Sequence, residues 1–380
     1  MRAGKIARLG LLALLVPLVM ASALAGPGVG RASAATCLSW SGLSPPSPGS
    51  VNRLNGVTAV SPCRVYAVGQ YWNGFSYQTL IARWNGTGWT QQASPNPAGN
   101  SADNVLRGVA AASSGNAWAV GYYGFNSSTL IEHWDGTAWT QVTSPSPGSS
   151  NQLYSVAAGS ASNAWAVGSY FNGTNWQTLA VHWNGSTWKQ VPTPNPDTGH
   201  DNSLLGVTVI SAGNAWAVGK YFNGTVSRNL IEHWNGSTWK VVAGPNPGGA
   251  TANPALVGVA AVSASNIWAV GSDTGVTLIE HWNGSSWKRV ASPTPNGLGD
   301  LQGVSAPSAN SVWAVGASYN GIATQTLVEH WNGTSWQAVP SPNPAGSASD
   351  SRLPGVAATS ANSVWAVGFA GSQSLAVHCC

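Results

Sequence analysis

The chain has 380 residues, of which 43% are apolar and only 7% are charged, and it holds 46 Gly, 23 Pro and 21 Trp. An ordinary globular chain is roughly 25% charged, and turn formers combined with aromatics favour short strands, so this composition indicates an all-β protein. Four of the 15 basic residues and none of the 11 acidic ones precede Thr36, so residues 36–380 are formally neutral, which argues against binding to nucleic acid or anionic membranes.

The first element, residues 1–35, has the pattern of a secretory signal peptide. A basic start that ends at Arg8 precedes an apolar run, Leu9–Met20, and small residues then allow cleavage after Ala25 or Ala35. We therefore expect a secreted, extracellular protein that does not insert into a membrane after cleavage. The apolar run is short for a spanning helix, and an uncleaved anchor is the alternative.

The rest of the chain is built from one repeat. An aromatic-Ala-Val-Gly phrase occurs seven times, at an average spacing of about 50 residues. The copies begin at Tyr66, Trp118, Trp165, Trp216, Trp268, Trp313 and Trp365. A second phrase, usually His-Trp-Asn-Gly, and one further Trp follow each of the first six copies. A repeat of this length is typical of a propeller blade.

Each repeat predicts four strands. In the unit around Trp216, the apolar runs Leu205–Ile210, Ala215–Phe222, Asn229–Trp234 and Ser237–Val242 are separated by turn-forming residues. Asn-Gly between two such runs is a strong hairpin signal, and no helical period is present. Residues 36–380 therefore predict a single domain, a seven-bladed β-propeller.

The two ends of the domain predict how the ring closes. The seventh unit stops inside its third strand, and residues 37–48 contain Trp40 and Pro46 at the spacing of Trp336 and Pro342. An N-terminal strand that completes the last blade removes the exposed sheet edges. We therefore expect a closed ring and a monomer.

The four cysteines favour the same closure. Cysteines flank the point where the hairpin of the last blade is interrupted, which predicts a Cys37–Cys380 bridge and leaves Cys63–Cys379 as the second pair. An exported chain meets an oxidising compartment that suits such bonds. Four cysteines allow three pairings, and the other two remain open.

The repeat resembles the units of kelch and galactose-oxidase-like propellers. The likeness rests on Trp216–Gly219, Glu232–Gly236 and Trp239 with Pro245, and it extends over residues 37–380. It departs from kelch in having one Gly instead of two, and His-Trp where kelch units favour Tyr-Asp. Asp135-Gly136-Thr137-Ala138-Trp139 is weakly similar to the Asp-box of sialidase-type propellers, with one residue fewer between Asp and Gly. Both likenesses imply the fold and leave the function open.

No residue pattern indicates a catalytic centre. Six histidines and four glutamates recur once per blade, so they cannot converge on one site. We interpret the histidines as hydrogen-bonding groups beside a core Trp and the glutamates as structural residues. The histidines are His133, His182, His233, His281, His330 and His378, and the glutamates are Glu132, Glu232, Glu280 and Glu329. The Asn-Gly-Ser/Thr triplets are interpreted as hairpin turns rather than glycosylation acceptors. We expect no catalytic residue, no metal and no cofactor.

Residues that depart from the repeat are the candidates for ligand binding. They occur in the loops between the second and third strands and in one inter-blade loop, and they are Trp72, Tyr123, Phe171, Trp176, Phe222, His200 and Asp201. The alternative is that these aromatics only cap the blade ends and that the inter-blade loop is only solvated.

The sequence thus predicts a non-catalytic binding or scaffolding propeller that recognises a glycan or an extracellular protein through the face with the long inter-blade loops. Because the axial strands are rich in small residues, as in Gly108–Ala111, we expect the channel to offer few contacts. The alternative is a carbohydrate-active enzyme or an oxidase. A sialidase-like site would need several converging Arg, and three of the seven in residues 36–380 could meet.

Overall fold

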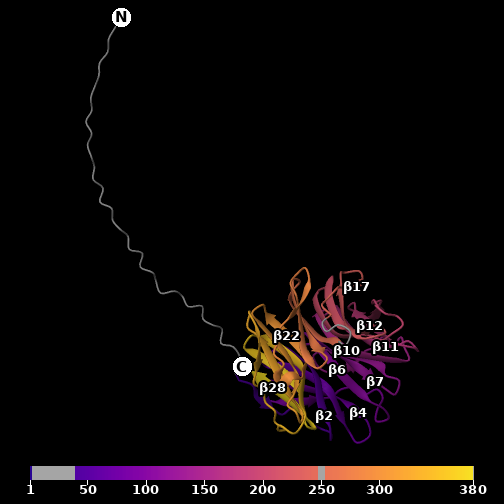
Figure 1. Cartoon of the computed structure of the whole chain (residues 1–380). Helices are drawn as coiled ribbons and strands as arrows, with labels where there is room; N and C mark the ends of the chain where they lie inside the picture. Colours follow the sequence, from indigo (N-terminus) through magenta and orange to yellow (C-terminus); the bar gives the residue numbers. More distant parts are fainter. Residues whose placement is uncertain (2–38, 247–252, 380) are drawn as a thin grey trace, which may run out of the picture. The chain divides into compact units, whose positions relative to one another are not determined.

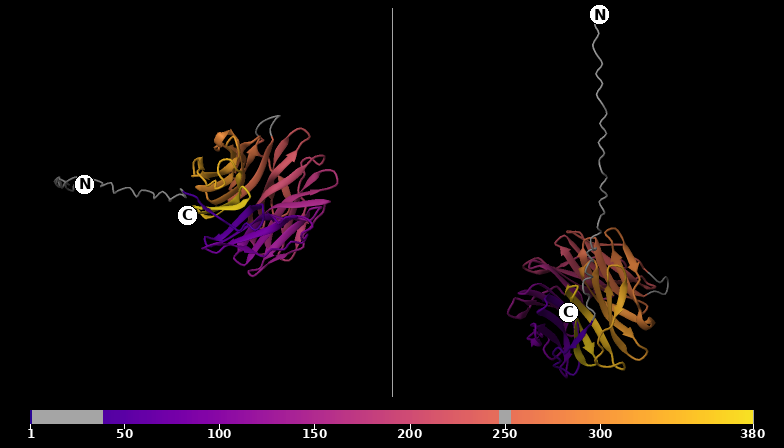
Figure 2. Two further views of the ribbon diagram at one scale, coloured as in Figure 1. Left: turned by 90° about the horizontal axis from the view of Figure 1, so that it is seen from below. Right: turned by 90° about the vertical axis from the view of Figure 1, so that its left-hand side faces the viewer.

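The computed structural model describes Met1 and residues 39–246 and 253–379. In these residues, 28 strands form seven antiparallel four-stranded sheets, arranged as the blades of a propeller (Figures 1 and 2). One short 3-10 turn, η2 (Pro295–Gly297), lies between the fifth and sixth blades. No described helix is long and apolar enough to cross a membrane. Residues 2–35 of the expected signal peptide lie outside the described residues.

The blades follow the chain in order. Blade 1 holds β2 (Asn52–Ser61), β3 (Arg64–Trp72), β4 (Tyr77–Trp84) and β5 (Trp89–Gln92), and blade 2 holds β6 (Asn104–Ser113), β7 (Asn116–Tyr123), β8 (Ser128–Trp134) and β9 (Trp139–Gln141). Blade 3 holds β10 (Ser150–Ser160), β11 (Asn163–Phe171), β12 (Trp176–Trp183) and β13 (Trp188–Val191), and blade 4 holds β14 (Asn202–Ser211), β15 (Asn214–Phe222), β16 (Ser227–Trp234) and β17 (Trp239–Val241). Blade 5 holds β18 (Pro254–Ser263), β19 (Asn266–Asp273), β20 (Val276–Trp282) and β21 (Trp287–Val290), and blade 6 holds β22 (Gly299–Ser308), β23 (Ser311–Tyr319), β24 (Thr324–Trp331) and β25 (Trp336–Val339). Blade 7 combines β26 (Ser351–Ser360), β27 (Ser363–Ala370) and β28 (Gln373–Cys379) with β1 (Ser41–Leu43).

The N-terminal strand completes the last blade, which confirms the predicted closure. β1 pairs antiparallel with β28, with Ser41 opposite His378 and Leu43 opposite Ala376. A hydrogen bond from the backbone N–H of Ser374 to the hydroxyl of Ser47, 3.0 Å long, holds the segment that follows. In Figure 2 the first and last blades, indigo and yellow, lie side by side.

Each blade is joined to the next by a cluster of aromatic rings. In blade 3, Trp165 is fully buried, and its ring centroid lies 4.9 Å from that of Trp234 and 5.0 Å from that of Trp239 in blade 4. The same arrangement recurs around the ring, with Tyr66 in place of Trp in blade 1. At the closure, Trp313 of blade 6 packs edge-on against Trp40 at 5.6 Å. Since each Trp buries roughly 150–250 Å2, these rings are a large part of the apolar contact between blades, beside Val, Leu and Ala side chains.

The Gly that ends each aromatic-Ala-Val-Gly phrase is required by the inner strand beside it. A Cβ on Gly271 would lie 1.9 Å from the carbonyl oxygen of Ala255, and the equivalent distances in the other six blades are 1.8–2.0 Å. The inner strand has a β-bulge at this level, seen as a register shift between Leu256 and Gly258. Only a residue without a side chain fits against the bulged backbone.

The prediction of one of the two disulfides, Cys63–Cys379, is wrong. Cys63 is a free, exposed cysteine, whereas Cys379 is disulfide-bonded, so the predicted Cys63–Cys379 pair does not form. The reason is local: Cys63 lies in the turn between β2 and β3 and packs against Gly86 in the neighbouring hairpin of its own blade. The predicted partners Cys37 and Cys380 lie outside the described residues.

We expect Gly271→Ala to lower the free energy of unfolding by about 3 kcal/mol or more, because the added methyl group must displace backbone rather than a flexible side chain. Gly88→Ala is the matched control, since no atom lies within 4 Å of a Cβ at that position. Chemical denaturation of both variants and the parent chain measures the difference. Equal stability of the two variants would show that the close approach does not constrain the blade.

A chain that starts at Gly49 lacks β1 and exposes the edge of β28. We expect it to melt at a lower temperature than a chain that starts at Thr36 and to self-associate, because an open sheet edge pairs with other edges. Calorimetry and light scattering of the two chains test this. If the shorter chain stays monomeric with an unchanged melting temperature, β1 is not needed for closure.

Candidate functional site

The connections that differ most between blades gather on one face of the propeller. We call this the loop face; it consists of the loop between the second and third strands of each blade together with the inter-blade segments. Backbone hydrogen bonds tie the two kinds of loop together, as from the N–H of Gly124 to Asp103 and from the N–H of Phe222 to Asp201, both 2.9 Å. The opposite face carries the short hairpin turns.

Aspartates fasten the loop face at three places. Asp103, Asp201 and Asp350 each accept a hydrogen bond of 2.9 Å from the backbone N–H that begins the third strand of the preceding blade. The backbone hydrogen bond from Thr324 is the main cause of a lowered pKa at Asp350. These carboxylates hold the loops in fixed positions. Asp201, which was predicted to bind a ligand, has this structural contact.

The structure brings five of the seven predicted ligand-binding residues together over blades 3 and 4. The Trp176 ring lies 5.8 Å from that of Phe171, and the backbone N–H of Trp176 donates to Asp201. His200 meets the Phe222 ring edge-on at 5.5 Å. His200 also lies 3.1 Å from Asp197, and this contact lowers the pKa of the Asp197 carboxyl.

The other two predicted residues lie elsewhere on the ring. Trp72 packs edge-on against Tyr77 in blade 1 at 5.2 Å, and Tyr123 packs against the core between blades 1 and 2. They do not belong to the cluster over blades 3 and 4.

The most exposed apolar side chains of the loop face are ones that the sequence analysis missed. Phe125 is 84% exposed, Phe75 is 78% exposed and Ile322 is 72% exposed. All three lie at the tips of second-to-third strand loops, in blades 2, 1 and 6. A signal was present, because Asn73-Gly74 and Asn320-Gly321 are followed by a large apolar residue where Thr follows the equivalent Asn-Gly of blades 3 and 4.

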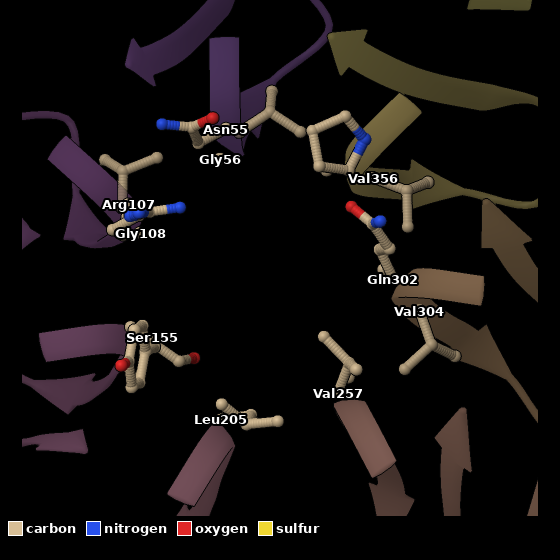
Figure 3. Close-up of a pocket in the computed structure, with 18 of the residues that line it drawn as sticks. Asn55, Gly56, Arg107, Gly108, Ser155, Leu205, Val257, Gln302, Val304 and Val356 are labelled. Carbon is tan, nitrogen blue, oxygen red and sulfur yellow. The ribbon is translucent and has the colours of Figure 1, made fainter. Parts of the chain in front are cut away.

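A cavity of about 480 Å3 occupies the axis of the propeller (Figure 3). Each blade contributes the residue that follows the buried Leu of its inner strand, which is the bulge position. These residues are Asn55, Arg107, Tyr154, Leu205, Val257, Gln302 and Pro354. No two blades have the same residue at this position, whereas the flanking Leu is the same in all seven.

The channel has a polar side and an apolar side. Leu205 and Val257 form the apolar wall in blades 4 and 5, and in Figure 3 they lie across the open centre from Asn55. On the polar side, Asn55 donates hydrogen bonds of 2.6 Å to Gln70 and 2.7 Å to the carbonyl of Leu106.

Three arginines line this channel, so the expectation that it offers few contacts is wrong. Arg352 is paired with Asp300 at 3.2 Å. The guanidinium of Arg53 lies 3.9 Å over the ring of Phe369, and that of Arg107 lies 5.6 Å from the ring centroid of Tyr122. Arg53 and Arg107 have no hydrogen bond or ion pair within the described part of the chain, and the buried Nε of Arg107 has no partner there.

The repeated histidines have the structural role that their recurrence predicts, because each stacks on the second-strand Trp of its own blade. His182 stacks on Trp165 at 4.4 Å, and its Nε2 lies 2.8 Å from the side-chain oxygen of Asn163. Equivalent stacks occur in blades 2 and 4–7, and burial lowers the pKa of all six histidines. Among the described residues, no group of three or more His, Cys, Asp and Glu could hold a metal ion.

The four glutamates are buried between blades rather than gathered at a site. The hydroxyl of Ser94 in the preceding inter-blade segment donates to Glu132 at 2.9 Å, and Asn229 of blade 4 donates to Glu280 of blade 5 at 2.7 Å. Burial raises the pKa of Glu132, Glu280 and Glu329 to about 8, and raises that of Glu232 well above its ordinary value.

The Asn-Gly-Ser/Thr triplets form the hairpin turns of the opposite face. The side-chain oxygen of Asn235 accepts 3.0 Å hydrogen bonds from the backbone N–H groups of Ser237 and Thr238. Equivalent bonds hold the hairpins that begin at Asn85, Asn184, Asn283 and Asn332. These contacts agree with the interpretation of the triplets as turns.

Comparison with solved structures supports a β-propeller. The chain is similar to YCF48 bound to D1 peptide, with 13% identity, a TM-score of 0.57 and coverage of 90% of this chain and 96% of that one. It is also similar to YCF48 from Cyanidioschyzon merolae, with 14% identity, a TM-score of 0.57 and coverage of 90% and 98%, and to U3-55K, with 12% identity, a TM-score of 0.59 and coverage of 92% and 99%. At these identities the likeness shows the fold alone. No protein-family model matches the sequence, and no curated protein matches it.

The buried glutamates predict how stability depends on pH. The Glu329 carboxyl has a pKa of about 8 in the fold against an ordinary value of 4.5, so its contribution to stability is complete below pH 4.5 and is lost as the pH rises towards 8. We expect the unfolding free energy of the parent chain to fall relative to that of Glu329→Gln between pH 5 and 8, with a slope difference of up to about 1.4 kcal/mol per pH unit.

Denaturant unfolding at several pH values measures this difference. The control is Asp135→Asn on an exposed hairpin. The hydrogen bond from the Thr137 side chain is the main cause of an Asp135 pKa of about 2, so this carboxyl is ionised throughout the pH range tested. That variant should follow the parent chain throughout this pH range. A Glu329→Gln variant that also follows the parent chain would contradict the raised pKa.

Proposed function

We propose that the chain is a secreted, non-catalytic propeller that binds an extracellular polypeptide on its loop face. The observation that carries the proposal is the set of apolar side chains at the loop tips, Phe75, Phe125 and Ile322, each at least 72% exposed. Isolated exposed apolar residues are common on soluble proteins. Among the described residues from 39 onward, the three most exposed large apolar ones occupy equivalent tips of one face, and aromatic anchors are typical of protein interfaces.

The loop face is also held in fixed positions, which favours binding. Asp103 and Asp350 tie inter-blade segments to the hairpins that carry Phe75 and Ile322, and Asn73 accepts hydrogen bonds from the N–H groups of Phe75 and Ser76. A loop that is already ordered loses less entropy when a partner binds. A propeller of similar structure, YCF48, is bound to a D1 peptide, which supports the view that this fold can accommodate a polypeptide ligand.

The proposal includes membership of a kelch or galactose-oxidase-like group and removal of a signal peptide on export, with cleavage after Ala25 or Ala35. The neutral formal charge and low charged content of residues 36–380 suit an extracellular protein with no affinity for nucleic acid. We propose a monomer, because the closed ring leaves only short outer strands of three or four residues as sheet edges. We also propose that the protein needs no cofactor.

A glycan is the second candidate ligand, and the observation that favours it is the cluster of Phe171, Trp176 and Phe222 with His200 over blades 3 and 4. Aromatic faces beside polar groups suit sugar rings. A carbohydrate-active enzyme is the remaining alternative, and the three arginines around the channel favour it. Assays of glycoside turnover and of alcohol oxidation, together with a glycan array, separate these alternatives from simple polypeptide binding.

We expect the triple variant Phe75→Ser, Phe125→Ser, Ile322→Ser to capture its extracellular partner at least tenfold less than the parent chain, because the apolar anchors are lost. Chemical cross-linking to proteins of the native culture medium, read by quantitative mass spectrometry, measures capture. The matched control is Val241→Ser, which removes a 49% exposed apolar residue from the outer strand β17 and should leave capture unchanged. Equal loss in both variants, or no loss in either, would contradict a docking site on the loop face.

A further inference from the structure

We infer that the axial channel is a carboxylate-binding site, built by Arg53 and Arg107, which receives an acidic side chain or the C-terminal carboxylate of a polypeptide. The inference rests on the proposed function, since the channel opens among the loops to which the partner would dock. It identifies the chemistry that this part of the partner must have.

The two arginines come from neighbouring blades. Arg53 precedes the buried Leu54 of β2, whereas Arg107 follows the buried Leu106 of β6. Their guanidinium groups nevertheless lie beside rings at equivalent positions, Phe369 and Tyr122, which follow the second-strand Trp of their blades by four residues. The charged groups therefore lie at a similar level of the channel.

The charges around the channel do not balance. Arg53, Arg107 and Arg352 line it, and Asp300, which binds Arg352 at 3.2 Å and Gln302 at 2.7 Å, neutralises only one of them. Asp350 also acts electrostatically on Arg352 and Arg53, so two carboxylates stand against three guanidinium groups. An excess of positive charge therefore remains in a domain whose formal net charge is zero.

Unused donors of the two arginines point to an anion. The Phe369 ring supports the flat face of Arg53 at 3.9 Å, which leaves the N–H groups at the edge of the guanidinium available. The buried Nε of Arg107 has no partner in the described residues, and leaving a buried donor unpaired costs about 1–3 kcal/mol. A carboxylate satisfies such donors with short, paired hydrogen bonds that a neutral ligand cannot match.

The rest of the cavity suits a polypeptide segment rather than a bare inorganic ion. Its volume of about 480 Å3 is within the range of ligand pockets. Figure 3 shows Arg107 and Gln302 facing the open centre from opposite sides, with Leu205 and Val257 along another edge. The amide can bond to a backbone group, and the apolar wall can contact the methylene groups that carry the carboxylate.

The experiment uses the chain from residue 36 and isothermal titration at low salt. The probes are hexaglutamate with a blocked C-terminus, hexaalanine with a free C-terminus, and blocked hexaglutamine. Binding of the first probe assigns the site to acidic side chains, and binding of the second assigns it to a terminal carboxylate. Either result supports the inference. If neither probe binds, or if hexaglutamine binds as well as hexaglutamate, the inference is wrong.

Variants locate the binding. We expect Arg53→Gln with Arg107→Gln to weaken binding of the carboxylate probe at least tenfold, and Arg289→Gln on the exposed outer strand β21 to leave it within twofold. If the double Gln variant does not fold, Arg53→Lys with Arg107→Lys keeps the charge but loses the paired geometry, and it should weaken binding at least threefold. Unchanged affinity in the folded double variant would overturn the site.

The result is independent of the loop-face test. The variant with Ser at positions 75, 125 and 322 keeps both arginines and should bind the carboxylate probe like the parent chain. Loss of partner capture in that variant with intact probe binding supports both conclusions. Absence of probe binding in the parent chain refutes the carboxylate site alone and leaves polypeptide docking on the loop face to be judged by capture.

Discussion

The propeller depends on one repeated contact, the insertion of the second-strand aromatic of each blade between two Trp rings of the next. Trp165 shows the contact in full, with ring separations of 4.9 and 5.0 Å to blade 4. Five of these contacts join blades that follow one another along the chain, and the other two need both ends of the domain. Trp313 packs on a single ring, Trp40, and Trp365 of blade 7 packs on Trp84 and Trp89 of blade 1. A strand of three residues, β1, thus completes a ring of seven sheets.

The aromatic contacts between blades and the close approach at Gly271 and its equivalents fix most of the propeller. Two kinds of position remain free to vary. One is the tip of the second-to-third strand loop, which contacts little of its own blade. The other is the bulge position of the inner strand, which projects into the channel and is different in all seven blades. The proposed docking face uses positions of the first kind. The proposed carboxylate site takes Arg107 from the second kind and Arg53 from the position that precedes the buried Leu of the inner strand.

The sequence predicted the features that repeat and missed those that do not. Strand number, blade number and closure were readable because Trp, Gly and Asn-Gly recur at fixed spacing, and the structural role of the histidines followed from the same recurrence. Arg53 and Arg352 are far apart in the sequence and become neighbours only when the ring closes, so their meeting could not be read from spacing. The Cys63–Cys379 pairing failed because an aligned position does not show which way a turn residue points, and Cys63 packs on Gly86 of its own blade.

The formal neutrality of residues 36–380 also understates their positive charge. Residues 36–380 hold 11 basic and 11 acidic residues, but burial raises the pKa of Glu132, Glu280 and Glu329 to about 8 and that of Glu232 well above 4.5. The three carboxyls with a pKa of about 8 are then largely protonated near pH 7, which leaves about three positive charges unbalanced. Since Arg53 and Arg107 lack carboxylate partners, part of that excess lies in the channel. Charge counted from the sequence argued against nucleic acid and anionic membranes, whereas charge placed in the fold favours a small anionic group at the axis.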